Sequence, residues 1–289
     1  MPEILHLNIK GVKDKTNINY KEKVETVQKM LYNVQNTMML NLQETHLSCQ
    51  EQIPKVWTQF NHVYHICSTF ATNDDRFAGI IMFINKFFEI QSEEILYQGR
   101  ILLVKAKKKE TSDYVNFISI YGKATGSNSD KLEILDVLWE KINSYELENP
   151  FIFGDFNYVT SFLDRNSNNF NNSDNVCKEK WNQIESKLKL YDSFRAIYKN
   201  RRLYTYSSPT SSKSRIDRIY VPESWYARLV KTVFENVGIS DHKIVKTIIS
   251  ANIIKGPGQY VFNNSMLDDI TFKEGIKEII NNFKDSVNI

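Results

Sequence analysis

The sequence contains few cysteines, and their spacing excludes two kinds of covalently stabilised fold. The 289-residue chain has three, Cys49, Cys67 and Cys177, and no C-x-x-C pair occurs. An odd number of scattered cysteines fits neither a disulfide framework nor a zinc module. We therefore expect a protein that works in a reduced compartment and is not secreted.

Long hydrophobic runs are also absent. The longest apolar stretch, residues 77–84, is far shorter than the roughly 20 residues that cross a bilayer as a helix. The opening segment MPEILHLNIK lacks the apolar core of a signal peptide. The sequence thus predicts no membrane partner, and its 42% hydrophobic and 25% charged residues are typical of a globular protein with a sizeable core.

The net charge of +3 hides an uneven distribution along the chain. Residues 178–218 contain eleven Lys or Arg but four Asp or Glu, so this stretch carries +7 and the remainder −4. Such a charge run is either a solvated helix face or a surface that attracts a polyanion such as nucleic acid. The charge pattern alone leaves both interpretations open.

Apolar periodicity predicts a mixed α/β architecture. Short runs rich in Ile, Val, Phe and Tyr predict strands at residues 4–7, 38–42, 80–84, 101–104, 115–121, 151–153, 216–221 and 244–249. Apolar residues at helical spacing predict helices that include residues 24–31, 132–142 and 181–188. Because several strands follow one another without a helix between them, we predict an α/β sandwich of mixed sheets packed face to face.

Two segments stand apart from this pattern. Residues 166–175 (NSNNFNNSDN) are polar and asparagine-rich, so we predict a loop there. After residue 249, Gly256-Pro257-Gly258 interrupts the chain, and a helical pattern resumes in residues 268–283. We predict a main domain of residues 1–251 and an appended linker and helix of residues 252–289.

Polar side chains suited to phosphodiester chemistry lie in or beside the predicted strands. Strand alternation would place Asp155 and Asn157, which follow residues 151–153, on one side. The full set consists of Asn8, Glu44, Asp155, Asn157, Asp217, Asp241 and His242. Each residue alone could be a capped turn or a strand end, but their joint occurrence indicates a site.

The motifs that carry these residues resemble a known superfamily. LNIKG, LQETHL, SIYG, GDFN, YTY, SRIDRIYV and SDH occur in this order over residues 4–250 and resemble the endonuclease/exonuclease/phosphatase superfamily. GDFN followed by LDR, LYD, YTY and SRIDRIYV is most similar to the endonucleases of LINE-type retrotransposons, which are relatives of abasic-site repair endonucleases. The tail sequence GPGQYVFNNSMLDDITF resembles the segment that joins such endonucleases to a reverse transcriptase.

The resemblance implies a fold and a function. The fold would be a four-layer α/β sandwich with two mixed β-sheets packed face to face, as in DNase I. The activity would be Mg²⁺-dependent nicking of double-stranded DNA, with Mn²⁺ as an alternative ion, leaving a 3′-hydroxyl for target-primed reverse transcription. The expected partner is a reverse transcriptase domain in the same polyprotein, and the expected location is the nucleus after cytoplasmic synthesis.

The resemblance also implies a role for each matched residue. Glu44 would be the principal metal ligand, with Asn8 nearby and Asp241 supporting the ion; oxygen ligands of this kind suit Mg²⁺ better than zinc. Asp155 would activate or orient the attacking water, and Asn157 would hold the phosphate or that water. His242 would contact the phosphate, and Asp217 would fix the tautomer of its ring and favour its charged form. Tyr121 would reach a phosphate oxygen.

Further residues are predicted to contact DNA. Thr205 lies on a hairpin that the family uses beside DNA, and the basic stretch flanks the YTY and SRIDRIYV motifs. The predicted DNA-binding residues are Thr205, Arg165, Lys199, Arg201, Arg202, Lys213 and Arg215.

One departure from the family pattern leaves alternatives open. Where the family usually has Tyr-Ala-Pro-Asn, this chain has Tyr121-Gly122-Lys123-Ala124. A flexible Gly-Lys turn would position Tyr121 less firmly, although Lys123 could supply a charge. The alternatives are an abasic-site repair endonuclease, a phosphodiesterase of the same superfamily that acts on a phospholipid or inositol phosphate, and a catalytically inactive DNA-binding module.

Overall fold

The computed structural model describes residues 1–13, 19–33, 37–109, 111, 113–167 and 171–250, together with residues 273, 274 and 277. The chain separates into two units, Met1–Ile253 and Ile254–Ile289. The predicted linker and helix of residues 252–289 lie outside the described residues, apart from those three positions. Within the described part of the chain, no helix combines the length and the apolar character needed to cross a membrane.

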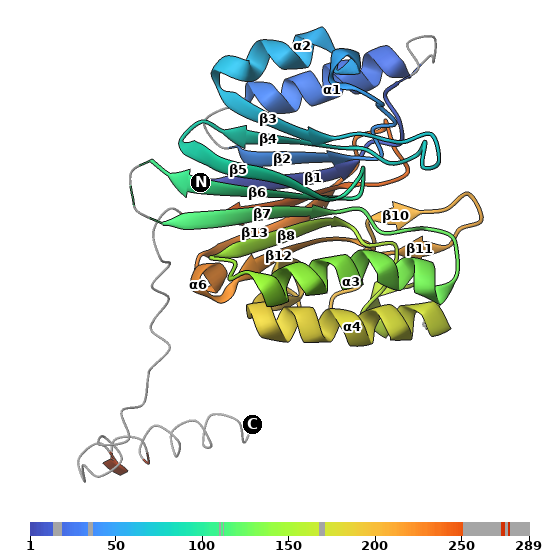
Figure 1. The fold of residues 1–289 in the computed structure, drawn as a ribbon. Coiled ribbons are helices and arrows are strands. Elements are labelled where there is room, and N and C mark those ends of the chain that lie inside the picture. Colours follow the sequence, from blue (N-terminus) through green and yellow to red (C-terminus); the bar gives the residue numbers. More distant parts are fainter. Residues whose placement is uncertain are drawn as a thin grey trace, which may run out of the picture. The chain divides into compact units, whose positions relative to one another are not determined.

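Two mixed sheets form the centre of the first unit (Figure 1). The first has the strand order β13-β14-β1-β2-β4-β3, with bounds Leu229–Glu235, Ile244–Ile249, Glu3–Asn8, Thr37–Gln43, Ile80–Asn85 and Tyr64–Thr69. The second has the order β5-β6-β7-β8-β12-β9, with bounds Phe88–Tyr97, Ile101–Lys108, Tyr114–Ile120, Pro150–Asp155, Asp217–Pro222 and Leu190–Asp192. A short hairpin pairs β10 (Tyr206–Ser207) with β11 (Lys213–Ser214).

Helices cover the outer face of each sheet, so the unit has four layers (Figure 1). α1 (Tyr20–Tyr32) and α2 (Lys55–Thr58) lie over the first sheet, and α3 (Asn128–Ser144) and α4 (Asn172–Leu188) lie over the second. The shorter elements are α5 (Ser193–Ile197), α6 (Glu223–Tyr226), η1 (Gln50–Gln52), η2 (Gln59–His62) and η3 (Phe162–Asp164).

Three apolar cores hold the layers together. One lies between the two sheets and includes Ile4, Met82, Phe117, Phe153 and Val245. A second packs the first sheet against α1 and α2, and a third packs the second sheet against α3 and α4. Strand β1 contributes Ile4 to the first core and its neighbour Leu5 to the second, as side-chain alternation requires. The predicted face-to-face sandwich is confirmed.

All eight predicted strands are present, but several elements were not predicted. The unpredicted strands β3, β5, β9 and β13 are the edge strands of the two sheets. Most side chains of β5 and β13 are exposed or half-buried, so their sequences lack a continuous apolar pattern. The predicted loop at residues 166–175 is wrong in its last part, because α4 begins at Asn172. A capping box of Asn171 and Asp174 starts that helix.

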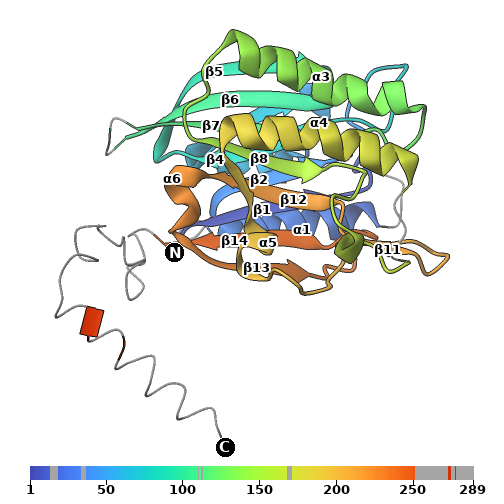
Figure 2. The same cartoon turned by 90° about the horizontal axis from the view of Figure 1, so that it is seen from below.

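Strand direction brings distant parts of the chain to one edge of the sandwich. β1 and β2 are parallel, as are β7 and β8, whereas β14 and β12 run antiparallel to their partners β1 and β8. The ends of β1, β2, β7 and β8 therefore lie beside the beginnings of β12 and β14. Figure 2 shows β14 lying between β13 and β1.

Candidate active site

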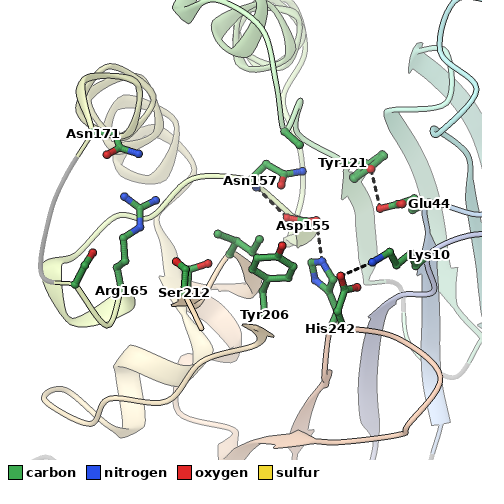
Figure 3. Close-up of a pocket in the computed structure, with 15 residues that line it drawn as sticks. Lys10, Glu44, Tyr121, Asp155, Asn157, Arg165, Asn171, Tyr206, Ser212 and His242 are labelled. Carbon is green, nitrogen blue, oxygen red and sulfur yellow. Dashed lines mark hydrogen bonds and ion pairs between the residues drawn. The ribbon is translucent and has the colours of Figure 1, made fainter. Parts of the chain in front are cut away.

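A cleft of about 630 Å³ opens where these strand ends meet (Figure 3). Its lining includes six of the eight predicted catalytic and metal-binding residues. These residues are Glu44, Tyr121, Asp155, Asn157, Asp241 and His242. Arg165, Asn171 and Ser212 line the opposite end of the cleft, with Tyr206 between the two groups. The structure thus brings the predicted strand-end residues together.

Asp155 lies at the end of β8 and is 1% exposed. Its Oδ1 accepts the backbone NH of Asn157 at 2.9 Å, and its Oδ2 accepts Nδ2 of Asn8 at 3.0 Å. Burial, and then the nearby charge of Asp217, raise the pKa of Asp155 to about 7. A carboxyl group with such a pKa can accept a proton near neutral pH.

Asp217 and His242 form the predicted pair. Nδ1 of His242 donates to Oδ2 of Asp217 at 2.8 Å, and Nε2 of His242 lies 3.9 Å from Oδ2 of Asp155. Burial alone would lower the pKa of His242, but the carboxylate of Asp217 raises it to about 9. The imidazole is therefore charged at neutral pH, and its Nε2 points towards Oδ2 of Asp155 (Figure 3).

Glu44 lies just beyond β2 and is held by two neighbours. Its Oε2 accepts the hydroxyl of Tyr121 at 2.9 Å and Nδ2 of Asn8 at 2.8 Å. Burial would raise the pKa of Glu44, but the contact with Nε2 of His46 at 3.4 Å and the two hydrogen bonds keep it below its usual value. Nδ2 of Asn8 therefore links Glu44 to Asp155. The amide oxygen of Asn8 is engaged separately, because its Oδ1 accepts the backbone NH of Lys10.

Asp241 lies on the same cleft and is contacted by a lysine that was not among the predicted site residues. Nζ of Lys10 donates to Oδ2 of Asp241 at 2.5 Å, and Oδ1 of Asp241 is buried without a hydrogen-bond partner. A buried carboxylate oxygen without a donor, beside the ionised Glu44, suits a hard divalent cation. The oxygen donors present therefore fit Mg²⁺ or Mn²⁺ on the Glu44 side of the cleft.

A second grouping of possible ligands fits a cation less well. One ligand atom each from Asp155, Asp217 and His242 lies within 4.8 Å of the others. However, both oxygens of Asp217 already accept hydrogen bonds from histidines, and Nδ1 of His242 makes one of these bonds. A cation bound there would have to displace those bonds, so this group suits a cation less well than the oxygen donors on the Glu44 side of the cleft.

The Gly122 turn is held on both sides, contrary to the expectation of flexibility. Its NH donates to the carbonyl of Asp155 at 2.7 Å, and its carbonyl accepts Nδ2 of Asn157 and Nη1 of Arg100, both at 2.9 Å. A Cβ at this position would lie 2.2 Å from the carbonyl oxygen of Phe156, so the close approach requires glycine. Tyr121 is thus firmly placed.

Lys123 does not supply a charge to the cleft. Its Nζ pairs with Oε2 of Glu133 at 2.7 Å, and it is absent from the residues that line the cleft. The departure from the family pattern therefore removes an amide at this turn without adding a cation in its place.

Two predicted DNA contacts are wrong. Arg215 is 0% exposed and makes a bidentate contact with Asp164, at 2.7 and 3.0 Å, and an ion pair with Asp192 at 2.8 Å. Thr205 is buried, and its hydroxyl accepts the backbone NH groups of Ile216 and Asp217. Neither residue is accessible to a ligand, because both are buried. Their contacts instead stabilise the chain between the hairpin and β12.

The other predicted DNA-binding residues are accessible to different degrees. Arg165 is half-buried and contacts Asp174, with its guanidinium in the cleft lining. The exposed ones are Lys199, Arg201, Arg202 and Lys213. Arg195 supports the loop that carries three of them, because its Nη1 donates to the carbonyl of Arg201 at 2.8 Å.

Several site residues were not assigned a role from the sequence. The ring of Tyr206 lies 4.9 Å from that of His242, and Ser240 Oγ accepts the NH of His242 while donating to the carbonyl of Asn8. Gln43 bridges the sheets: its Nε2 donates to Ser119 Oγ and its Oε1 accepts the NH of Asp155. Gln43 could have been recognised from the sequence as a polar residue at the end of a mainly apolar strand.

Comparisons with known proteins agree with this geometry. The model of the Endonuclease/Exonuclease/phosphatase family matches residues 39–242. The Transposon TX1 uncharacterized 149 kDa protein of Xenopus laevis is 27% identical over 251 residues, which cover 82% of this chain and 18% of that protein. The chain therefore spans less than a fifth of the length of this relative.

Solved structures show the same fold. An AP endonuclease from Leishmania major has a TM-score of 0.69 at 14% identity, covering 87% of this chain and 88% of that one. A 3′-phosphatase from Neisseria, bound to a product DNA hairpin, has a TM-score of 0.68 at 17% identity, covering 86% of this chain and 100% of that one. The predicted DNase I-like arrangement of two packed sheets is confirmed.

Proposed function

The chain belongs to the Endonuclease/Exonuclease/phosphatase family, and from this premise we propose that it is a divalent-metal-dependent endonuclease that nicks double-stranded DNA. The observation that carries the proposal is the convergence of Glu44, Asp155 and His242 on one cleft. These groups come from three distant segments of the chain. Glu44 supplies an ionised carboxylate, Asp155 a carboxyl group with a pKa of about 7, and His242 a charged imidazole. Groups of these kinds can accept a proton from water and stabilise the charge that develops on the phosphoryl oxygens during phosphodiester hydrolysis.

The residues divide the work of hydrolysis in the following way. Asp155 accepts a proton from the attacking water, whose oxygen forms a bond to phosphorus. His242, held by Asp217, places its charged Nε2 against a phosphoryl oxygen, and Asn157 orients the phosphate or the water. Mg²⁺ or Mn²⁺ on the Glu44 and Asp241 side would supply positive charge for the phosphoryl and leaving oxygens.

The products follow from which phosphorus–oxygen bond breaks. Breaking the bond between phosphorus and the 3′ oxygen leaves that oxygen as a 3′-hydroxyl, after it takes a proton from solvent, and leaves the phosphate on the 5′ oxygen of the downstream strand. A free 3′-hydroxyl can be extended by a polymerase, whereas a 3′-phosphate blocks extension. The similarity to a transposon protein and the tail sequence support a role in target-primed reverse transcription in the nucleus, with a reverse transcriptase in the same polyprotein.

Plasmid nicking tests this function directly. We expect the protein to relax supercoiled plasmid in Mg²⁺ or Mn²⁺ and not in EDTA. A DNA polymerase should then incorporate labelled nucleotides at the nicks without phosphatase treatment. Incorporation only after phosphatase treatment would contradict the role in priming, and turnover confined to abasic duplex or to a phospholipid would indicate one of the alternative enzymes. Binding without any turnover would indicate an inactive module.

The exposed basic loop provides a test of DNA binding. Replacing Lys199, Arg201 and Arg202 with alanine should weaken binding equally on unrelated DNA sequences, because phosphate contacts carry no sequence information. The slope of log affinity against log salt should fall by roughly 0.9 for each of these side chains that binds a phosphate. Fluorescence anisotropy across a salt series measures both quantities.

A matched control removes the same charge elsewhere. Lys21, Lys29 and Lys55 are exposed on α1 and α2, on the outer layer of the first sheet. Their replacement with alanine should leave the slope unchanged. If both triple variants altered the slope equally, the effect would come from net charge, and the basic loop would be an ordinary solvated surface.

A further inference from the structure

A histidine lies in the core between the two sheets, behind the candidate active site. His6 on β1 is 0% exposed, and its Nε2 lies 3.1 Å from Oδ1 of Asp217 on β12 of the opposite sheet. His6 belongs to none of the predicted site residues, and it does not line the cleft. Asp217 thus contacts two histidines, His6 from within the core and His242 from the cleft.

Asn41 determines which nitrogen of His6 faces Asp217. Asn41 is directly opposite His6 in the parallel pairing of β1 and β2, and its Nδ2 donates to Nδ1 of His6 at 2.9 Å. Nδ1 is therefore an acceptor, so the ring proton of the neutral imidazole is on Nε2. His6 consequently donates to Asp217 across the gap between the sheets.

Strand β1 carries a second active-site contact two residues further on. Asn8 lies on the same face of β1 as His6, and its amide donates to Asp155 and Glu44. The same strand therefore fixes Asp217 through His6 and fixes the two cleft carboxylates through Asn8. Strand geometry sets the spacing between these contacts, so β1 aligns the pair of Asp217 and His242 with Asp155.

The donor from His6 restricts the orientation of Asp217. A buried carboxylate that has too few donors is costly, and it turns towards whatever donors remain. With His6 in place, Oδ1 is anchored to the first sheet and Oδ2 remains for Nδ1 of His242. Without it, His242 would be the one side-chain donor among the described contacts of Asp217, and both groups could rotate together.

We propose that His6, oriented by Asn41, is a positioning residue that holds Asp217 so that Asp217 in turn holds His242 against the scissile phosphate. The proposal rests on the nuclease function proposed above for its kinetic consequences. Its structural content, a hydrogen bond that fixes the ring of His242, does not depend on the substrate.

Two substitutions of His6 separate positioning from bulk packing. His6→Leu keeps the approximate size of the side chain but removes the donor, whereas His6→Gln can place an amide NH near the position of Nε2. We expect His6→Leu to lower kcat for plasmid nicking by roughly 10- to 100-fold with little change in KM, as for other groups that orient a catalytic side chain. His6→Gln should recover most of that loss.

A double-mutant cycle shows whether His6 acts through Asp217. If it does, His6→Leu combined with Asp217→Asn should nick no more slowly than Asp217→Asn alone. The matched control is His65→Leu, which removes a half-buried histidine on β3 whose Nε2 contacts the carbonyl of Phe88. It should leave kcat unchanged. Additive losses in the cycle, or equal losses in His6→Leu and His6→Gln, would overturn the proposal.

Ring signals of ¹⁵N-labelled histidine give a readout that does not require activity. The Nδ1 proton of His242 should be protected from exchange in the wild-type protein and His65→Leu, and exchange-broadened in His6→Leu. If wild-type protein failed to nick DNA, the nuclease function would be wrong, while this spectrum would still decide the positioning role. An unchanged His242 signal in His6→Leu would refute that role.

Discussion

Replacing Asp155 or His242 with alanine is expected to reduce DNA nicking by roughly 10⁴-fold or more while leaving the protein folded. In the proposed mechanism, each substitution removes a group that acts on the reacting phosphate and water in the transition state. Asp155→Ala removes the proton acceptor, and His242→Ala removes the positive charge next to the phosphoryl oxygen. Single-turnover nicking of supercoiled plasmid at saturating Mg²⁺ measures the loss.

The control variants change the same residue types at exposed positions far from the cleft. Asp113 precedes β7, at the opposite end of that strand from Tyr121, and His62 ends η2. Asp113→Ala and His62→Ala should nick at the wild-type rate. If Asp155→Ala kept its activity and its melting temperature, Asp155 would have no role as proton acceptor.

The same assignment predicts the pH dependence of nicking. Asp155 has to be ionised to accept a proton, so the rate should rise as pH increases through the pKa of about 7. A divalent cation bound beside Glu44 would move this limb to lower pH. His242 has to be protonated, so the rate should fall as pH increases through the pKa of about 9. The falling limb should disappear from the residual activity of His242→Ala.

Replacing Arg215 with leucine is expected to destabilise the protein strongly. Arg215 contacts both Asp164 and Asp192, and each of these carboxylates is buried. Burial would raise the pKa of Asp164, but Arg215 keeps it below its usual value. Removing the guanidinium leaves two buried carboxylates without that partner, which costs about 3–5 kcal/mol in the free energy of unfolding.

Thermal unfolding and DNA binding together distinguish this structural role from a DNA contact. Arg215→Leu should lower Tm by roughly 6–20 °C for a chain of this size. The control Lys213→Leu removes an exposed cation two residues away and should leave Tm unchanged. If Arg215→Leu weakened DNA binding and left Tm at the wild-type value, the buried ion pair would be the wrong description.

The sequence predicted the central strands better than the edges, for a physical reason. Central strands are buried on both faces and appear as continuous apolar runs, as residues 80–84 of β4 do. The edge strand β5 buries few side chains and carries Ser92, Glu93 and Glu94 facing solvent. No apolar periodicity marks such a strand, and its pairing depends on a neighbour that becomes known only in three dimensions.

The cleft residues were predictable because they occur in motifs at strand ends, whereas the residues behind them were not. His6 and Asn41 are polar residues flanked by apolar ones in their strands, and Asp217, the partner of His6 on the opposite sheet, lies 211 residues away in the chain. Arg215 was misassigned for a related reason. A count of charges registers a cation but not the two buried carboxylates that engage it.

The position of β14 has a consequence for how the protein folds during synthesis. β14 pairs with both β13 and β1, so the last strand in the described part of the chain enters the first sheet between an edge strand and the first strand. His242 and Asp241 lie just ahead of it, whereas β1, the strand beside which they are placed, is the first one made. Such non-local pairing forms late, because loop-closure entropy opposes it until the intervening chain is ordered. A ribosome-bound chain that has not yet released β14 therefore has no assembled candidate active site, and the proposed nicking activity would begin only after β14 has paired with β1.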